Sequence, residues 1–289
     1  MTRSTRHYLS ITDLSPDEVS LVLDLAERPT LPRVLDGKGA ALLFEKPSSR
    51  TRHSVEMAVL QLGGHPITDT GPLDKREKIE DLTRVMIGYH AVVAARVFEH
   101  SKVERMSAVS PDTPIVNMLS DFEHPLQGLA DLLTLRQEFG DLKGRRIAWL
   151  GEFNNVARSL RRGATMLDAD FVACCPEGFG PRLDDAVDVI ALPAEAVEGA
   201  HAIVTDTWYS MGSEDEADER RPVFRPFQVT SALLARAEPD AVFLHCLPGH
   251  RNEEATDDVF DSPQSRIFPE AHNRMHTARA LFAFLFGVR

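Results

Sequence analysis

Hydroxyl and guanidinium groups are concentrated in the segment at residues 44–52, which reads FEKPSSRTR. An expected strand precedes the segment and an expected helix follows it, so its backbone N–H groups lie at the positive end of a helix dipole. Planar guanidiniums suit phosphate or carboxylate oxygens. A well-capped helix with solvated arginines is the alternative, but it accounts for only one serine. The segment therefore favours an anion site, and it lacks the glycines of a nucleotide-binding P-loop.

Two further segments place polar side chains where open α/β sheets bind ligands. Arg96 closes an apolar run, at the carboxyl end of an expected strand. His124 and Gln127, in the letters HPLQ, stand at the cap of an expected helix and one turn into it, so both can face one cavity. A capping histidine with a solvated glutamine explains the same letters equally well.

Amide, carboxylate and thiol groups follow expected strands in the second half of the chain. One of the adjacent Asn154 and Asn155 is expected to cap a helix, and the other then remains for a polar ligand. Asp206 leads into the letters WYSMG, and ordinary loop chemistry explains the glycine there but not an acid and a serine beside aromatics. The letters HCLPGHR, which include Cys246, end the last expected strand.

Histidines near Cys246 raise a zinc alternative. His250 follows Cys246 closely, and His272 and His276 have the i, i+4 spacing of a zinc-protease helix. The glutamate that such a helix needs is absent, because Asn273 stands in its place, and Cys246 has no C-x-x-C partner. We therefore expect neither a metal nor an organic cofactor, and we keep a zinc hydrolase as the less favoured hypothesis.

Short apolar runs alternate with helical patterns along the chain, which predicts α/β architecture with two doubly wound parallel-sheet domains and helices on both faces. The letters SPDE at residues 15–18 predict a capping box and the start of a helix reaching residue 26. The expected strands are 39–44, 65–68, 91–96, 113–119, 146–150, 170–175, 202–205 and 241–246. The other expected helices are 51–63, 77–90, 101–109, 125–139, 156–167, 194–198 and 271–286.

The helix expected at residues 125–139 begins with a proline and is followed by a glycine, and we place the domain junction there. The first domain then covers residues 1–135 and the second covers residues 136–270. The final helix has a broad apolar face, so it must pack on something large. The acidic stretch at residues 214–219 is expected to be a solvated loop.

The composition argues against several classes of function. The 289 residues include 32 Lys and Arg against 44 Asp and Glu, a net charge of −12, which argues against nucleic acid as a partner. The longest apolar runs fall short of the roughly 20 residues that a bilayer helix needs, so no membrane partner is expected. The three cysteines, Cys174, Cys175 and Cys246, cannot form a disulfide framework. A cytoplasmic protein is the expectation.

Six segments of the chain, taken together, resemble the ornithine carbamoyltransferases within the aspartate/ornithine carbamoyltransferase family. They are FEKPSSRTR, HPLQ, the paired asparagines, DTWYSMG, HCLPGHR and NRMHTARAL, in the family's order. The resemblance implies a carbamoyl-phosphate domain at residues 1–135, an ornithine domain at residues 136–270, and a last helix, about 271–289, that returns to the first domain. It also implies a homotrimer with sites near subunit interfaces and a step in arginine biosynthesis.

The resemblance implies a role for each matched residue. The phosphate of carbamoyl phosphate is assigned to Ser48, Ser49, Arg50 and Thr51, with Ser49 standing where the family commonly has threonine. Its carbamoyl end is assigned to Arg96, His124, Gln127 and Arg274. Ornithine is assigned to Asn155, Asp206, Ser210 and Met211, and its reacting end, next to the carbamoyl group, to Cys246 and Leu247. The residues implied in catalysis are Arg50, Arg96, His124, Cys246 and Arg274.

The implied reaction transfers the carbamoyl group of carbamoyl phosphate to the δ-amine of L-ornithine and yields L-citrulline and phosphate. Negative charge develops on the carbonyl oxygen while phosphate leaves, and fixed cations and donors stabilise it. Only the neutral amine attacks, and its pKa is about 10 by analogy with lysine, so activity is expected to rise with pH. The departing phosphate, Cys246 and a water all remain open as the proton acceptor.

Other hypotheses stay open at this stage. Within the same class, the acceptor amine is putrescine, N-acetylornithine or aspartate instead of ornithine. Two hypotheses belong to other classes of function: the zinc hydrolase, and a noncatalytic homologue that binds a small anion.

Overall fold

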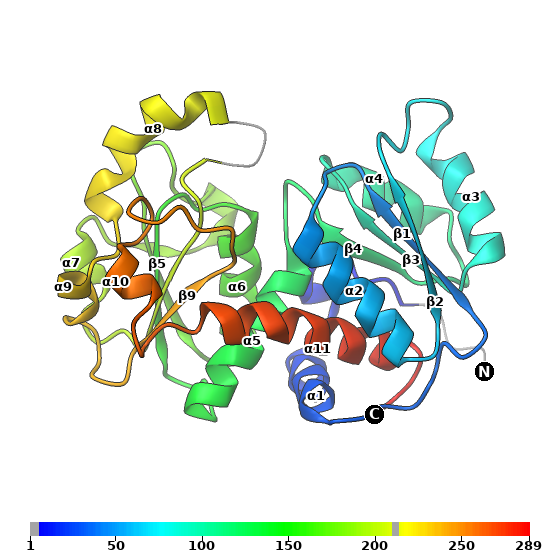
Figure 1. Ribbon diagram of the computed structural model, residues 1–289, viewed down its shortest axis with the longest axis horizontal. Helices are drawn as coiled ribbons and strands as arrows, with labels where there is room; N and C mark the ends of the chain where they lie inside the picture. The colour runs from blue at the N-terminus through cyan, green and yellow to red at the C-terminus, as the bar shows by residue number, and fades with distance from the viewer. Residues whose placement is uncertain (1–5, 210–213) are drawn as a thin grey trace. The chain divides into compact units, whose positions relative to one another are not determined.

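The computed structural model describes residues 6–209 and 214–289. The chain divides into two compact units, of which unit 1 comprises Met1–Leu133 and His272–Arg289, and unit 2 comprises Thr134–Ala271. Figure 1 shows the elements of both units. Ser210 and Met211, two of the residues predicted to bind ornithine, lie outside the described residues.

Unit 1 is built on a parallel sheet of four strands in the order β2-β1-β3-β4. The two central strands, β1 and β3, and the edge strand β4 are almost wholly buried and mainly apolar, as expected for strands covered on both faces by helices. The edge strand β2 is largely exposed. The strands are β1 (Gly39–Phe44), β2 (His65–Thr70), β3 (Val92–Arg96) and β4 (Ile115–Leu119).

Helices connect the strands of unit 1. The capping box is confirmed, because Ser15 accepts from the Glu18 N–H, Glu18 accepts from the Ser15 N–H, and Pro16 opens the helix. Ile79, Val103 and Met106 pack with one face of the sheet, and Figure 1 shows α2 and the end of α11 on its other side. The elements are η1 (Ile11–Asp13), α1 (Pro16–Glu27), α2 (Ser49–Gln61), α3 (Ile79–Tyr89) and α4 (His100–Ala108).

Two helices run from one unit into the other, α5 (Pro125–Phe139) and α11 (Ile267–Leu285). The C-terminal helix returns to unit 1, as expected. There Arg279 donates to the carbonyls of Ala26 and Arg28, at the carboxyl end of α1. The predicted start of α11 at residue 271 is wrong by four residues, because Pro269 stands within the first turn, where a missing backbone N–H breaks no helical hydrogen bond.

Unit 2 is built on a parallel sheet of five strands in the order β7-β6-β5-β8-β9. Its core includes Ala148, Ile203 and Phe243 from three neighbouring strands and Phe260 from a short helix. The strands are β5 (Arg146–Leu150), β6 (Asp170–Cys174), β7 (Asp188–Val189), β8 (Ala202–Thr205) and β9 (Val242–His245). The helices are α6 (Asn155–Met166), η2 (Leu183–Asp185), α7 (Pro193–Ala196), η3 (Glu214–Glu216), α8 (Ala217–Phe224), η4 (Arg225–Phe227), α9 (Ser231–Leu234) and α10 (Asp257–Phe260).

The fold class predicted from the sequence is confirmed, but several elements of unit 2 were not predicted. The acidic stretch at residues 214–219 is not a loop: it forms η3 and the start of α8, where Asp218 and Glu219 stand in the first turn, favoured by the helix dipole. The two-residue β7 and the four-residue α9 and α10 are too short for periodicity to reveal. Among the described residues, no helix combines the length and apolar character of a membrane span.

Candidate active site

In each unit, candidate residues stand at the ends of the two neighbouring strands between which the order of strands in the sheet switches direction. In unit 1, β1 has β2 on one side and β3 on the other, and Phe44, the last residue of β1, pairs with Arg96, the last residue of β3. In unit 2, Thr205 at the end of β8 pairs with Leu150 of β5 and with His245 of β9. Open α/β sheets bind their ligands at such switch points, beyond the carboxyl ends of the strands.

Thr51 is the meeting point of three segments of unit 1 that are far apart in the sequence. Its hydroxyl oxygen accepts hydrogen bonds from Arg96 Nη1 at 3.3 Å and from Arg274 Nη2 at 2.5 Å. Thr51 is fully buried, and the two arginines are 6% and 5% exposed. Two buried guanidiniums therefore converge on one hydroxyl in the first turns of α2, and together with the helix dipole they concentrate positive charge there.

Ser48 caps α2, since its Oγ accepts the Thr51 N–H at 3.3 Å. Ser49 and Arg50 form the exposed first turn. Arg52 pairs with Glu56 at 2.8 Å on the same helix, so this guanidinium is engaged on the surface. The plainer interpretation, a well-capped helix, accounts for Ser48 and Arg52 but not for the convergence of guanidiniums on Thr51.

His124 stands at the start of α5, where its carbonyl accepts the N–H groups of Gln127 and Gly128. Burial lowers the pKa of His124 well below its ordinary value, and the positive charges of Arg274 and Arg96 lower it further. The imidazole is therefore neutral near pH 7, with one nitrogen able to donate a hydrogen bond. Such a donor suits an oxygen that gains negative charge during a reaction.

Gln127 is fully buried one turn into α5. Its Nε2 donates to Asp131 Oδ1 at 2.7 Å, and Asp131 is itself 1% exposed. Sequence reasoning did not single out Asp131, because an acid one turn along a helix is ordinarily solvated. The contact orients the amide of Gln127 within the helix.

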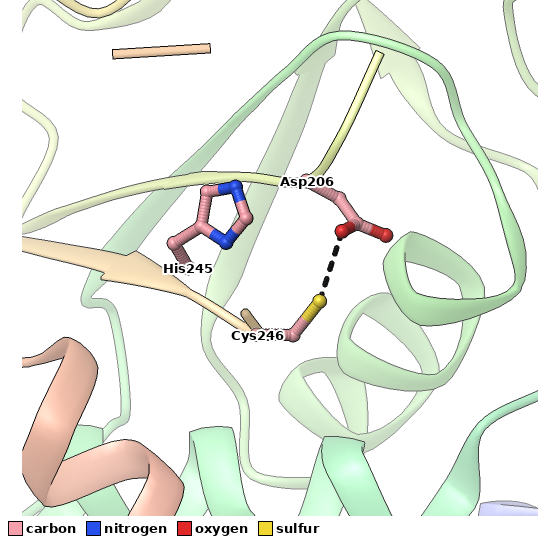
Figure 2. A group of neighbouring side chains, drawn as sticks. All are labelled: Asp206, His245 and Cys246. Atoms are coloured by element: carbon pink, nitrogen blue, oxygen red, sulfur yellow. Dashed lines mark hydrogen bonds between the residues drawn. The ribbon is translucent and has the colours of Figure 1, made fainter. Parts of the chain in front are cut away.

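Asp206 is the centre of a group of polar contacts in unit 2 (Figure 2). Cys246 Sγ donates to Asp206 Oδ1 at 2.9 Å. The Thr207 N–H donates to the same oxygen at 2.7 Å, and Asn154 Nδ2 donates to Oδ2 at 2.8 Å. The carboxylate thus joins the loops that follow β5, β8 and β9.

The structure distinguishes the two adjacent asparagines. Asn154 caps α6, because its Oδ1 accepts the N–H groups of Val156 and Ala157, and its other end reaches Asp206. Asn155 is the first residue of α6 and is half-buried. The sequence predicted that one of the two asparagines caps the helix but did not decide which one. The structure shows that it is Asn154, which also contacts Asp206 of the candidate site.

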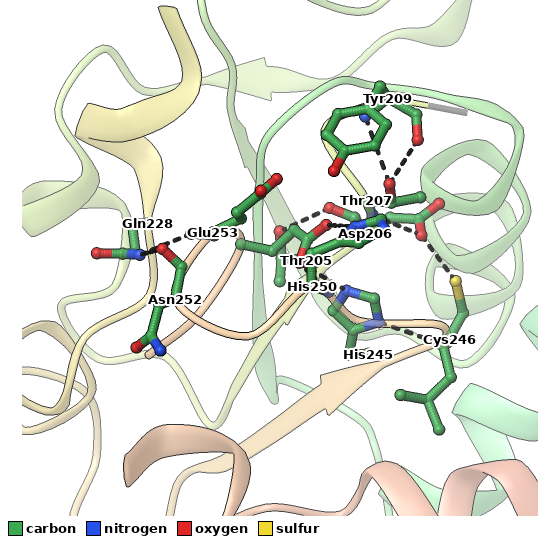
Figure 3. A network of polar contacts seen from close by, with 12 residues as sticks. Thr205, Asp206, Thr207, Tyr209, Gln228, His245, Cys246, His250, Asn252 and Glu253 are labelled. Atoms are coloured by element: carbon green, nitrogen blue, oxygen red, sulfur yellow. Dashed lines mark hydrogen bonds and ion pairs between the residues drawn. The ribbon is translucent and has the colours of Figure 1, made fainter. Parts of the chain in front are cut away.

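A wider network holds the loop that carries Cys246 (Figure 3). His245 Nδ1 accepts the Leu247 N–H at 2.9 Å, and Leu247 has a left-handed φ of 56°, a conformation that L-residues rarely adopt. The rings of Tyr209 and His250 stack with centroids 4.8 Å apart. The His250 ring lies 2.8 Å from the fully buried Glu254. The loop after β9 is thereby connected to the segment after β8.

The zinc hypothesis required Cys246, His250, His272 and His276 as one set of ligands. Among the residues that the structure describes, the groups whose ligand atoms come within 4.8 Å of one another are Asp206 with His245 and Cys246, and His250 with Glu253 and Glu254. The proposed ligand set is therefore wrong, because Cys246 and His250 fall into different groups. His272 and His276 lie one turn apart on α11, and neither belongs to these two groups of described residues.

The predicted site residues divide between the two units. Unit 1 contains Ser48, Ser49, Arg50, Thr51, Arg96, His124, Gln127 and Arg274, and unit 2 contains Asn155, Asp206, Cys246 and Leu247. Within unit 1, contacts bring Ser48, Thr51, Arg96 and Arg274 together. Within unit 2, a hydrogen bond joins Asp206 to Cys246.

The fold and the site define a protein of two parallel α/β domains, one with two buried guanidiniums at a helix N-terminus and one with a carboxylate–thiol pair. The family model described as the aspartate/ornithine carbamoyltransferase carbamoyl-P binding domain matches residues 6–137. The model described as the Asp/Orn binding domain of the same family matches residues 143–285. The chain belongs to the aspartate/ornithine carbamoyltransferase family, which confirms the resemblance seen in the sequence.

Individual relatives match over nearly their whole length. An ornithine carbamoyltransferase from Rhodococcus opacus is 44% identical, with 100% of this chain and 98% of the relative covered. One from Pyrococcus abyssi is 41% identical, with 98% of this chain and 96% of the relative covered. The solved structure of the ornithine carbamoyltransferase from Pyrococcus furiosus superposes with a TM-score of 0.93 at 39% identity and covers 99% of both chains.

Proposed function

We propose that the chain transfers the carbamoyl group of carbamoyl phosphate to the δ-amine of L-ornithine, yielding L-citrulline and phosphate. The observation that carries the proposal is the convergence of Arg96 and Arg274 on Thr51 at the amino end of α2. The convergence lies in the part of the chain that matches the carbamoyl-P binding model. The names of the full-length relatives support ornithine as the acceptor.

The proposal assigns the first substrate to residues 1–135 with the final helix, and every residue named for it lies in unit 1. Ser48, Ser49, Arg50 and Thr51 offer hydroxyls, N–H groups and a guanidinium to the phosphate, which suits an anion at a helix terminus. The carbamoyl end is bound by a set of donors, Arg96, His124, Gln127 and Arg274. The neutral ring of His124 has one N–H group, which the proposal assigns as a hydrogen-bond donor to the carbonyl oxygen.

The second substrate is assigned to residues 136–270, within unit 2. The carboxylate of Asp206 is matched to the α-ammonium group of ornithine. Asn155, with Ser210 and Met211 from the sequence prediction, is assigned to the rest of the amino-acid end. Cys246 and Leu247 are assigned to the reacting δ-amine and the carbamoyl group that it attacks. N-Acetylornithine lacks the α-ammonium group and is expected to be a poor substrate.

The chemistry requires charge stabilisation and orientation more than covalent catalysis. Attack of the neutral amine on the carbonyl carbon forms the new C–N bond, and cleavage of the C–O bond releases phosphate. Arg96 and Arg274 stabilise the oxygen that gains negative charge, and Arg50 stabilises the departing phosphate. The amine gives up one proton during this exchange, which is accepted by the departing phosphate, by Cys246 as a thiolate or by a water.

The direct test is citrulline formation from carbamoyl phosphate and ornithine, run beside putrescine, N-acetylornithine and aspartate on metal-stripped protein. Ornithine-dependent turnover supports the proposal. Faster turnover with another amine would show that this amine, and not ornithine, is the acceptor substrate. Arg50→Ala is expected to abolish turnover and phosphate binding while the far-UV circular dichroism stays unchanged. Arg84→Ala, which removes an exposed guanidinium paired with Asp81 on α3, is the matched control and is expected to remain active.

We further propose a homotrimer whose sites lie near the subunit interfaces. Large apolar side chains are exposed on neighbouring elements of unit 1, a pattern typical of association surfaces. They are Met57 and Leu60 on α2, Ile67 on the edge strand β2, and Val85 and Tyr89 on α3. Light scattering is expected to give three times the chain mass, and Leu60→Glu is expected to lower it; a monomeric wild type contradicts the proposal.

The proposal also places the enzyme in the cytoplasm, in a biosynthetic step toward arginine. Cys174, Cys175 and Cys246 are all free thiols, which agrees with a reducing compartment. Complementation of an arginine-requiring strain that lacks this activity tests the biosynthetic role, and failure to restore growth despite expression contradicts it.

A further inference from the structure

Glu45 joins three loops at the carboxyl end of the unit 1 sheet. It follows β1 directly, and its N–H donates to the carbonyl of Arg96 at 2.9 Å. Its Oε1 accepts the Leu73 N–H and its Oε2 accepts the Phe98 N–H, each at 3.2 Å. One carboxylate therefore fixes the loops that follow β1, β2 and β3, a few residues before Ser48.

Lys102 on α4 supplies the countercharge. Its Nζ lies 2.7 Å from Glu45 Oε1 and 2.9 Å from Asp74 Oδ2. The side chains of Lys102 and Glu45 are 9% and 2% exposed, whereas that of Asp74 is 38% exposed. Burial by itself lowers the pKa of Lys102, but the hydrogen bonds with Glu45 and Asp74 outweigh it and raise the pKa above its ordinary value. The ammonium group is therefore charged at neutral pH.

This ion pair lies beside the group of cations that the proposed phosphate site uses. The loop that starts at Glu45 continues directly to the cap of α2, and Glu45 is bonded to the backbone of Arg96. If Lys102 were absent, the buried charge of Glu45 would be uncompensated. The charge would repel a phosphate dianion and would attract guanidiniums of the site away from their ligand.

We propose that Lys102 is a positioning residue for carbamoyl phosphate: it balances the charge of Glu45 and thereby keeps the loop after β1 in the form that binds phosphate. The inference rests on the proposed function of that site. Lys102 acts through Glu45, and Asp74 is the exposed partner that extends the pair to the segment after β2.

The first measurement is the Kd of inorganic phosphate by isothermal titration calorimetry, together with the KM of carbamoyl phosphate. Lys102→Met is expected to raise both about tenfold, equivalent to about 1.4 kcal/mol. The KM of ornithine at saturating carbamoyl phosphate is expected to stay within about twofold, because unit 2 holds the residues proposed for ornithine. A merely destabilised protein would not show this split.

Removal of the second charge gives the sharper test. In Lys102→Met with Glu45→Gln, neither charge of the buried pair remains and the carboxylate of Asp74 stays exposed to solvent, so phosphate affinity is expected to return to within about threefold of the wild type. Lys102→Arg keeps the charge and is expected to bind phosphate as the wild type does. Arg105→Met is the matched control, because Arg105 lies one turn further along α4 and pairs with Glu80, away from Glu45.

Each result supports or overturns the inference. Unchanged phosphate affinity in Lys102→Met overturns it, as does a double variant that binds no better than the single one. If Lys102→Met does not fold, the double variant and Lys102→Arg still test the inference. Both are expected to bind phosphate about as well as the wild type, and weaker binding by either one overturns the inference. A wild type that binds no phosphate and forms no citrulline instead overturns the proposed function, so the two failures are distinct.

Discussion

Arg158 and Asp185 form a two-pronged ion pair in the interior of unit 2. Arg158 Nε lies 2.7 Å from Asp185 Oδ1, and Nη2 lies 2.9 Å from Oδ2. Their side chains are 5% and 2% exposed, and the carboxylate also accepts the Arg182 N–H. The pair attaches the turn at η2 to α6, close to the loop that carries Asn154.

Asp185→Ala is expected to lower the free energy of unfolding by about 3–5 kcal/mol, because it leaves the Arg158 guanidinium buried without its carboxylate. Urea unfolding followed by circular dichroism measures the loss. Asp36→Ala is the control, since it breaks an exposed pair with Arg33 and is expected to cost less than about 1 kcal/mol. Equal effects of the two variants would show that the buried pair contributes little.

Thr51→Val tests the meeting point of the two guanidiniums. The substitution keeps the shape of the side chain but removes the oxygen that accepts from Arg96 and Arg274. We expect the KM of carbamoyl phosphate to rise about tenfold or more, since each lost charge-assisted hydrogen bond costs about 1.5–3 kcal/mol. Thr165→Val, on the exposed part of α6, is the control; wild-type kinetics for both variants would exclude a role for Thr51.

His124 makes stability depend on pH in a defined direction. Its pKa is lowered in the folded state from the ordinary value of 6.5, mainly by burial, so below pH 6.5 the unfolded chain binds a proton that the folded protein does not. Stability is therefore expected to fall as pH falls below 6.5, and to be insensitive to this group at higher pH. Thermal unfolding between pH 5 and 8 measures the slope, and His124→Gln is expected to flatten it. An equal slope in the variant would assign the dependence to other groups.

The adjacent Cys174 and Cys175 are expected to be unreactive in the folded protein. Burial raises the pKa of Cys174 to about 11 and that of Cys175 to about 12. At pH 8 only about one Cys174 thiol in a thousand is then ionised, and the thiolate is the nucleophile. Maleimide labelling at pH 8 followed by peptide mass spectrometry is expected to leave both unmodified, whereas urea-unfolded protein reacts at both. Labelling of either at the unfolded rate would contradict their burial.

The fold was predictable where local pattern and tertiary role agree. The strand at 146–150 and the helix at 125–139 were predicted with the bounds that the structure has, because apolar runs and a proline–glycine frame define them. The start of α11 and the acidic start of α8 were not, because a proline and a cluster of acids are both tolerated in the first turn of a helix. The proline was interpreted as lying before the helix, and the cluster of acids was interpreted as a solvated loop.

The site was only partly predictable, because its contacts join residues far apart in the chain. Nothing local in the sequence indicates that Lys102 pairs with Glu45: a lysine on a helix is ordinarily solvated, and only the tertiary fold buries this one against the residue that follows β1. Asn154 and Asn155 are equally suited to cap a helix, so only the structure could choose between them. The family resemblance assigned Thr51 and Arg274 to the same substrate, but only the structure shows the hydrogen bond between them.

The division of the chain has a consequence for its synthesis. Unit 1 needs His272–Arg289 as well as Met1–Leu133, whereas unit 2 is continuous. On the ribosome, residues 6–133 emerge first but lack the buried Ala278, Leu281 and Phe282 of α11 until residues 134–271 have been made. The apolar surface of the first part of the chain therefore stays exposed until α11 is synthesised. Unit 2 is able to complete its core before unit 1 does. Cotranslational chaperones that shield apolar surface are expected to matter for the first-made half of this protein.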